Sequence, residues 1–137
     1  MRRPVTPAHA ATIALAAGLD AACVLAFVAI GRHAHHDGET AAGIWHTAWP
    51  FLTGLAVGLA AVRFWRQPLA IGRAGVGAWV GATGVGMLIR VLAGQGTAAA
   101  FILVATAFLG LFLVGWRAVA IAARHFGLSS KRTAQRG

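Results

Sequence analysis

Acidic residues are scarce in this sequence: the 137 residues include only three Asp and Glu, against twelve Lys and Arg. Charged residues make up 11% of the chain, whereas soluble globular proteins carry about a quarter. Tyrosine and asparagine are absent, and a single cysteine excludes both an internal disulfide and a cage of thiolate metal ligands. This low charge content argues against an ordinary soluble domain.

Hydrophobic residues account for 58% of the chain and form four long runs. Each run is close to the roughly 20 residues that a helix needs to cross a membrane, where lone strands cannot satisfy their backbone. The sequence therefore predicts an all-α, polytopic membrane protein with four transmembrane helices, at residues 10–30, 45–62, 74–93 and 98–122. The first run could instead be a cleaved signal peptide, but its length and its internal Asp20 favour a membrane anchor.

The positions of Lys and Arg predict the orientation, because short loops rich in these residues stay on the cytoplasmic side. Ten of the twelve lie in the N-terminal segment, the second connection and the C-terminal region, which is counted from Arg117, whereas the first loop holds Arg32 alone. Both termini are therefore expected in the cytoplasm. The predicted regions are a cytoplasmic N-terminus (1–9), a transmembrane bundle (10–122) and a basic cytoplasmic tail (123–137).

In a soluble chain this excess of positive charge would suggest nucleic acid as a partner. Here the charge follows the expected topology, so membrane lipids are the predicted partner and nucleic acid is not. The segment from Leu128 to Gly137 is polar and basic. We expect it to be disordered and attracted to anionic lipid headgroups.

Pairs of glycines four residues apart occur in the second and third predicted helices. They are Gly54 with Gly58, and Gly77 with Gly81. Small residues at this spacing allow helices in lipid to approach closely. They indicate contacts within one bundle, or else a face that binds a second copy or another membrane subunit.

Asp20 is the most unusual residue of the predicted helices, because a carboxylate near mid-membrane is costly. It lies about 15 Å from either end of its helix, and Thr53, Thr83 and Thr106 lie at similar depth in the other three. If the four face one another, the hydroxyls can donate to Asp20 and form a polar centre for a proton or a cation. Alternatively, each Thr bonds its own backbone, and Asp20 stays protonated because burial disfavours its charge.

Three arginines are possible functional charges: Arg32, Arg90 and Arg117. Arg90 is an alternative partner for Asp20, but about 10 Å of depth separates them. We therefore expect Arg90 to extend toward the outer membrane interface.

The first loop and the start of the next helix contain candidate metal ligands at His33, His35, His36 and His46. Imidazole suits zinc or copper, although this spacing matches no known cage. Solvated histidines are the simpler interpretation, and pH sensing is a further alternative. Haem is not expected because no His lies at membrane depth, and no cofactor is predicted.

Several short motifs resemble the domain of unknown function 3054 family, whose members are small four-helix bacterial membrane proteins. They are Gly31, Arg32 and His35; Thr47 to Leu52 with Gly54; Gly86, Met87, Arg90, Gly94, Gly96 and Thr97; and Gly115, Trp116 and Arg117. The resemblance covers about Asp20 to Arg117. It implies the fold and a place in the bacterial cytoplasmic (inner) membrane, and it supplies no activity, substrate or cofactor.

No enzymatic activity is predicted, because the sequence offers no convergent nucleophile, base and oxyanion donors. The first functional hypothesis is a structural or assembly role through helix packing. The alternative is a small proton- or cation-coupled transporter or channel that uses Asp20. Transport requires a water-accessible path to Asp20, whereas a structural role predicts a closed bundle around it.

Overall fold

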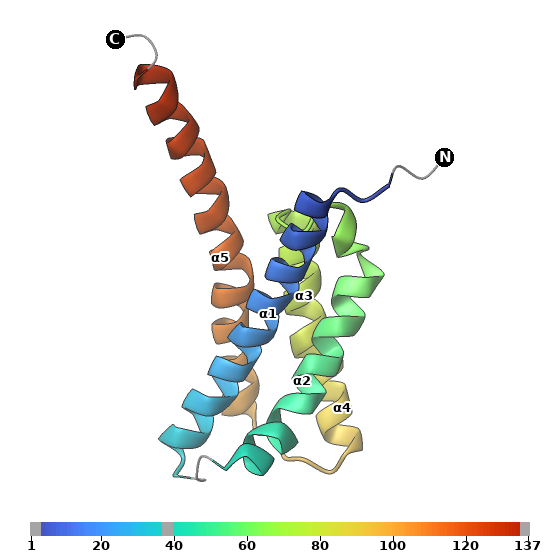
Figure 1. Cartoon of the computed structure of the whole chain (residues 1–137). Coiled ribbons are helices and arrows are strands. Elements are labelled where there is room, and N and C mark those ends of the chain that lie inside the picture. Colours follow the sequence, from blue (N-terminus) through green and yellow to red (C-terminus); the bar gives the residue numbers. More distant parts are fainter. Residues whose placement is uncertain (1–3, 37–39, 135–137) are drawn as a thin grey trace.

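The computed structural model describes residues 4–36 and 40–134, and this part of the chain contains helices and no strands (Figure 1). Three long helices are α1 (Pro7–Ala34), α2 (Ala41–Ala61) and α5 (Ala99–Ala134). Thr6 and Thr40 cap the first two of these helices, because each hydroxyl accepts a hydrogen bond from a backbone N–H in the first turn.

A fourth long helix is built from short segments between α2 and α5. It consists of η2 (Ile71–Gly75), α3 (Val76–Val80), η3 (Gly81–Val85) and α4 (Gly86–Leu92). The two η segments are π-helical, so this helix alternates between wide and ordinary turns. A short 3₁₀ turn, η1 (Phe64–Arg66), follows α2.

Three helices are long and apolar enough to cross a membrane: Pro7–Ala34, Ile71–Leu92 and Ala99–Gly127. They correspond to the first, third and fourth predicted spans. The second predicted span lies in α2, which is helical as expected but does not belong to this group. Its first half contains Trp45, His46 and Pro50, which lower its mean hydropathy. The described residues therefore give three clear candidate spans, whereas the sequence predicts four; the predicted span in α2 is not among the three.

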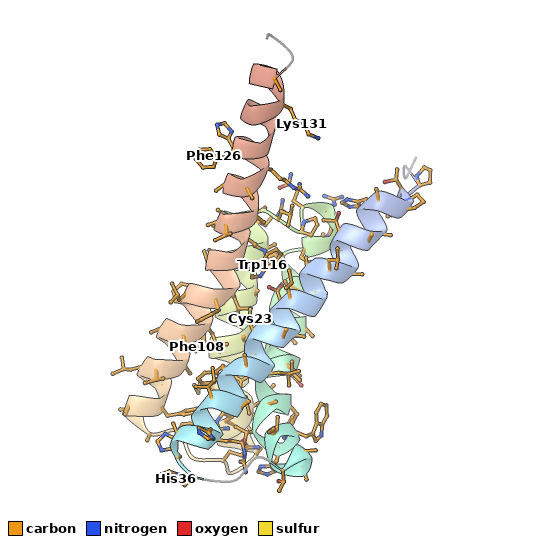
Figure 2. The ribbon with its side chains drawn as sticks, turned by 60° about the vertical axis from the view of Figure 1, so that its left-hand side comes forward. Cys23, His36, Phe108, Trp116, Phe126 and Lys131 are labelled. Atoms are coloured by element: carbon orange, nitrogen blue, oxygen red, sulfur yellow. The ribbon has the colours of Figure 1, made fainter. Side chains whose placement is uncertain are left out.

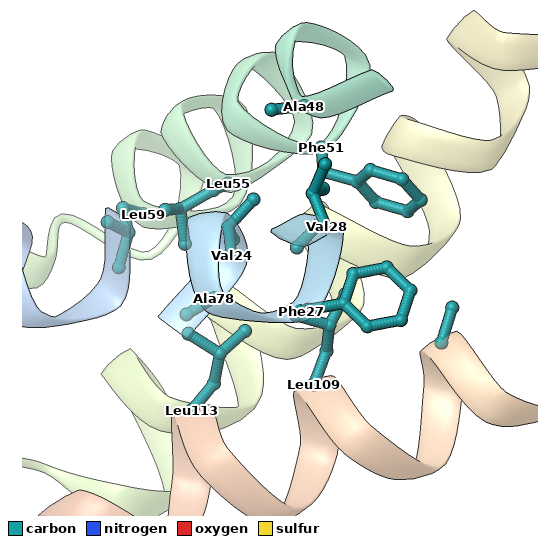
Figure 3. Packing of buried hydrophobic residues seen from close by; sticks show 12 residues of the cluster. Val24, Phe27, Val28, Ala48, Phe51, Leu55, Leu59, Ala78, Leu109 and Leu113 are labelled. Atoms are coloured by element: carbon teal, nitrogen blue, oxygen red, sulfur yellow. The ribbon is translucent and has the colours of Figure 1, made fainter. Parts of the chain in front are cut away.

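The helices form a bundle in which the start of α1 and the end of α5 lie on the same side (Figure 1). α2 packs against the segmented helix and α1, while α5 packs against α1 and α3. Side chains from α1, α2, α3 and α5 converge in the apolar core (Figure 3). Phe27 belongs to this core, and its ring centroid lies 5.5 Å from those of Phe51 and Phe108.

α5 continues well past the rest of the bundle (Figure 1). Its 36 residues span about 54 Å, more than the roughly 30 Å of a membrane core. Phe126 and Lys131 lie on this projecting part (Figure 2). The expectation of a disordered tail is wrong for residues 128–134, which are helical, while residues 135–137 lie outside the described part. Residues 128–134 continue the helix because an established helix propagates readily and this segment contains no Pro.

Candidate functional site

Asp20, near the middle of α1, forms a buried ion pair with Arg117 of α5. Arg117 Nη1 donates to Asp20 Oδ1 at 2.7 Å, and Nη2 donates to Oδ2 at 2.8 Å. Both side chains have an exposed fraction of 0%. Two parallel bonds of this kind match the planar guanidinium to the carboxylate and are stronger than single neutral hydrogen bonds.

The remaining donors of Arg117 bind backbone carbonyls. Nε donates to the carbonyl of Pro68 at 3.0 Å, and Nη1 also donates to that of Leu113 at 2.9 Å. Pro68 lies in the connection after α2, so one guanidinium links α1, α5 and this connection. A buried charge is tolerated only when its hydrogen bonds are made, and here every nitrogen of Arg117 has a partner.

Trp116 completes the surroundings of Asp20. Its indole Nε1 donates to Asp20 Oδ1 at 2.8 Å, and its ring lies 4.5 Å from Cζ of Arg117. The cation therefore also meets an aromatic face. Figure 2 shows Trp116 on the side of α5 that approaches α1. Asp20 accepts three hydrogen bonds in all, as an ionised carboxylate can.

A glycine on the segmented helix leaves space for Arg117. A methyl group on Gly75 would lie 3.3 Å from Cδ of Arg117 and 3.6 Å from Cα of Val114. Gly75 ends the first π-helical segment, η2. The wide turn and the missing side chain together let the aliphatic part of Arg117 pass close to the backbone.

The predicted polar centre of Asp20 with three threonines does not form. Thr53 Oγ1 donates to the carbonyl of Trp49 at 2.8 Å, and Thr83 Oγ1 donates to that of Trp79 at 2.7 Å. At Thr106 the backbone carbonyl accepts a hydrogen bond from the indole N–H of Trp79 at 2.9 Å.

The physical reason for this correction is local. The carbonyl one helical turn back is always within reach of a Thr hydroxyl, whereas Asp20 is already occupied by Arg117 and Trp116. Asp20 does not lie in the membrane-spanning region without a counter-ion either, because Arg117 donates to both of its carboxylate oxygens.

Arg90 does not pair with Asp20, and its exposed fraction is only 8%. Nη1 donates to Oε1 of Gln95 at 2.7 Å, and Nη2 donates to the carbonyl of Gly96 at 2.8 Å. Its Cζ lies 4.6 Å from the ring centroid of Phe101. The guanidinium thus reaches toward the end of its helix, in the expected direction, but the turn after α4 supplies its acceptors and buries it.

The third candidate charge, Arg32, lies near the end of α1 and is partly buried. Its Nη1 donates to Thr47 Oγ1 at 3.2 Å. The four candidate histidines lie near this same end, where Figure 2 shows His36. Within residues 4–36 and 40–134, no three His, Cys, Asp or Glu side chains come together as a metal site would require. The acidic residues of the first loop, Asp37 and Glu39, lie outside the described residues.

The two glycine pairs lie in one interface within the bundle, between α2 and the segmented helix. A methyl group on Gly58 would lie 2.8 Å from Cα of Gly81, and one on Gly77 would lie 2.7 Å from a methyl carbon of Val62. A methyl group on Gly54 would lie 2.6 Å from the backbone nitrogen of Gly86. Each glycine allows two backbones to approach, as small residues do between membrane helices.

A family of proteins of unknown function, DUF3054, matches residues 17–120. The chain belongs to this family. The match includes both partners of the buried ion pair and confirms the resemblance found in the sequence. Neither a curated protein nor a solved structure shows a significant match to this DUF3054 protein.

Sequence reasoning identified Asp20, Arg90 and Arg117 as unusual but did not join the first to the third. The predicted span 98–122 contains Arg117 only near its end, and the orientation argument counts it with the basic residues of the C-terminal region, whereas α5 continues to Ala134. One signal was available: the chain has a single acidic residue within its predicted spans. An arginine near the end of a span is a natural partner for it.

Proposed function

We propose that this protein is a four-pass protein of the bacterial inner membrane, with both termini in the cytoplasm and a structural or assembly role. The buried pair of Asp20 and Arg117 is the observation that carries the proposal. It holds the first and last helices together inside a closed core, where water has no access to the carboxylate. We assign no catalytic step to it.

Two features support a fourth crossing by α2. Its 21 residues span about 31 Å, which matches the roughly 30 Å of a membrane core. The two ends of the chain also lie on the same side of the bundle (Figure 1). An even number of crossings returns a chain to the side on which it began.

The basic residues favour the cytoplasm for that side. Arg63, Arg66 and Arg73 flank the connection after α2, and the projecting end of α5 adds Arg124 and Lys131. Arg117 no longer counts as a loop charge, but the bias remains on the same side without it.

The surroundings of Asp20 argue against the transporter alternative. A proton or cation site must be reached by water, whereas both Asp20 oxygens are occupied by protein donors. The nearby Arg117 also repels a cation. The structural role therefore fits this geometry better than transport through Asp20.

Proton flux in proteoliposomes tests this proposal. Wild type and Asp20→Asn are compared under an imposed pH gradient and membrane potential, with empty liposomes as the baseline. We expect no flux above this baseline in either protein. Flux in wild type that disappears in a folded Asp20→Asn variant would overturn the structural proposal in favour of transport.

Assembly is tested along α5, whose outward side chains include Leu103, Leu111 and Val119, each at least 69% exposed. These face lipid or a partner, either a second copy or another membrane subunit. When photo-crosslinkers are placed at each position in native membranes, we expect a discrete crosslinked band from those positions that face the partner. Uniformly absent products from all three positions would remove the assembly part of the proposal.

A further inference from the structure

A cavity of about 450 Å³ lies at the end of the bundle opposite the two termini of the chain. Its walls come from the last turns of α1, from α2, from Arg90 and from the start of α5. A volume of this size falls in the range of small-molecule binding sites. Neither the ion pair of Asp20 nor the glycine interface contributes to it.

The inner wall and the rim of the cavity differ in exposure. Phe27, Val28 and Arg90 are buried, with exposed fractions of 8% or less. Val104 on the rim is 59% exposed, and Ala100 beside it is exposed as well. The cavity therefore opens on an apolar surface of α5.

Arg90 gives the cavity a positive charge that lacks a carboxylate partner among the described residues. Its Nη1 and Nη2 donate to neutral oxygens of Gln95 and Gly96. Its Nε is buried and has no hydrogen-bond partner. Such a group is costly unless a further acceptor reaches it, and an anion would supply both the acceptor and the missing charge.

The lining of the cavity combines polar and apolar side chains. Besides Arg90 it includes Arg32, whose Nη1 donates to the Thr47 hydroxyl, and His35. Its apolar residues include Phe27, Phe101 and Val104, and the Phe101 ring lies against the guanidinium of Arg90. A ligand that matches this lining has an anionic head and an apolar chain.

We propose that this cavity binds one anionic lipid. Its phosphate or carboxylate lies beside Arg90 and Arg32, and its acyl chain lies along Phe27, Phe101 and Val104. This binding site goes beyond the proposed structural role. It does not depend on the orientation of the protein in the membrane.

Native mass spectrometry of the detergent-purified full chain tests the proposal. Phosphatidylglycerol, phosphatidylcholine, oleate and inorganic phosphate are added separately. We expect one retained phosphatidylglycerol or oleate per chain, held about tenfold more tightly than phosphatidylcholine. The relative affinities of phosphatidylglycerol and oleate decide between a phosphate and a carboxylate head.

Two variants locate the site. Val104→Trp fills the cavity from its exposed rim, and Leu103→Trp is the matched control, because Leu103 is 71% exposed and does not line the cavity. Arg90→Gln removes the buried charge, and Arg73→Gln removes an exposed charge elsewhere. We expect Val104→Trp to weaken retention about tenfold and Arg90→Gln to abolish the preference for anionic lipids.

Three outcomes would overturn the proposal. Equal retention of phosphatidylcholine would contradict a role for charge, and retention of inorganic phosphate with the same affinity would contradict a role for the acyl chain. Identical behaviour of Val104→Trp and Leu103→Trp would place the lipid outside the cavity. This last comparison stands even where Arg90→Gln disturbs the turn that Arg90 stabilises.

Discussion

Asp20 and Arg117 are 97 positions apart in the sequence, yet they meet through two parallel hydrogen bonds of 2.7 and 2.8 Å. The first helix and the last helix of the bundle are thereby joined at a fully buried point. Because Arg117 also binds the carbonyl of Pro68, the pair fixes the connection after α2 in the same place. Loss of either charge should therefore affect the whole bundle.

Asp20→Asn leaves the guanidinium of Arg117 buried without a counter-charge. Removing one partner of a buried ion pair costs about 3–5 kcal/mol of unfolding free energy, and we expect a loss of this size. Thermal unfolding in detergent, followed by circular dichroism, measures it. Arg73→Gln provides the control, since Arg73 is exposed and should leave the transition unchanged.

The double variant Asp20→Leu with Arg117→Met removes both charges at once. Replacing a whole buried pair by apolar residues is often close to neutral, so we expect it to regain most of the stability that Asp20→Asn loses. A double variant no more stable than Asp20→Asn would show that Pro68 and Leu113, rather than Asp20, are the important partners of Arg117.

Trp116→Phe keeps an aromatic ring beside Arg117 but removes the indole N–H that donates to Asp20 at 2.8 Å. The lost bond involves a charged acceptor, so we expect the unfolding free energy to fall by about 1.5–3 kcal/mol. Trp45→Phe is the control, because the Trp45 side chain is 62% exposed. Equal effects of the two substitutions would contradict a role for the bond to Asp20.

Gly81→Ala tests the close contact between α2 and the segmented helix. The added methyl group would lie 2.8 Å from the backbone nitrogen of Gly58, so the helices must move apart. We expect a loss of about 1–3 kcal/mol, as for other overpacked positions. Gly84→Ala has no atom within 4 Å of the new methyl group and should be neutral or slightly stabilising. Thermal unfolding of both variants in one detergent makes the comparison.

The helical architecture could be predicted from the sequence, because runs of apolar residues and their charged flanks determine where helices cross lipid. The glycine spacings likewise indicated close helix contacts. The exact ends of α5 could not be predicted, since helix propensity extends past the apolar run into the basic tail. Because Arg117 is counted with the basic residues of this C-terminal region, its pairing with Asp20 could not be recognised.

The threonine centre was mispredicted for a different reason. Equal depth in four helices says nothing about which way each side chain points around its helix. Thr53 is exposed on the outside of α2, and Thr83 bonds its own turn. The burial of Arg90 by the turn after α4 could likewise not be predicted, because it depends on the hydrogen bonds that Arg90 donates to Gln95 and Gly96.

The proposed topology predicts the side of the membrane on which single cysteines react. In a Cys23→Ser background, cysteines are introduced at the exposed positions Ala42, Gln67 and Ala134 and treated with a membrane-impermeant maleimide.

We expect Ala42→Cys to react in intact spheroplasts, because it follows the first crossing. Gln67→Cys and Ala134→Cys should react only in inverted vesicles, because α2 and α5 each return the chain to the cytoplasm. Position 67 is decisive. The basic residues around it favour the cytoplasmic side, whereas the lower hydropathy of α2 favours a helix that does not cross and leaves position 67 outside. Labelling of Gln67→Cys in spheroplasts would mean that α2 remains on the outer side. Three crossings would then place Ala134 outside as well, so positions 67 and 134 test the same topology independently.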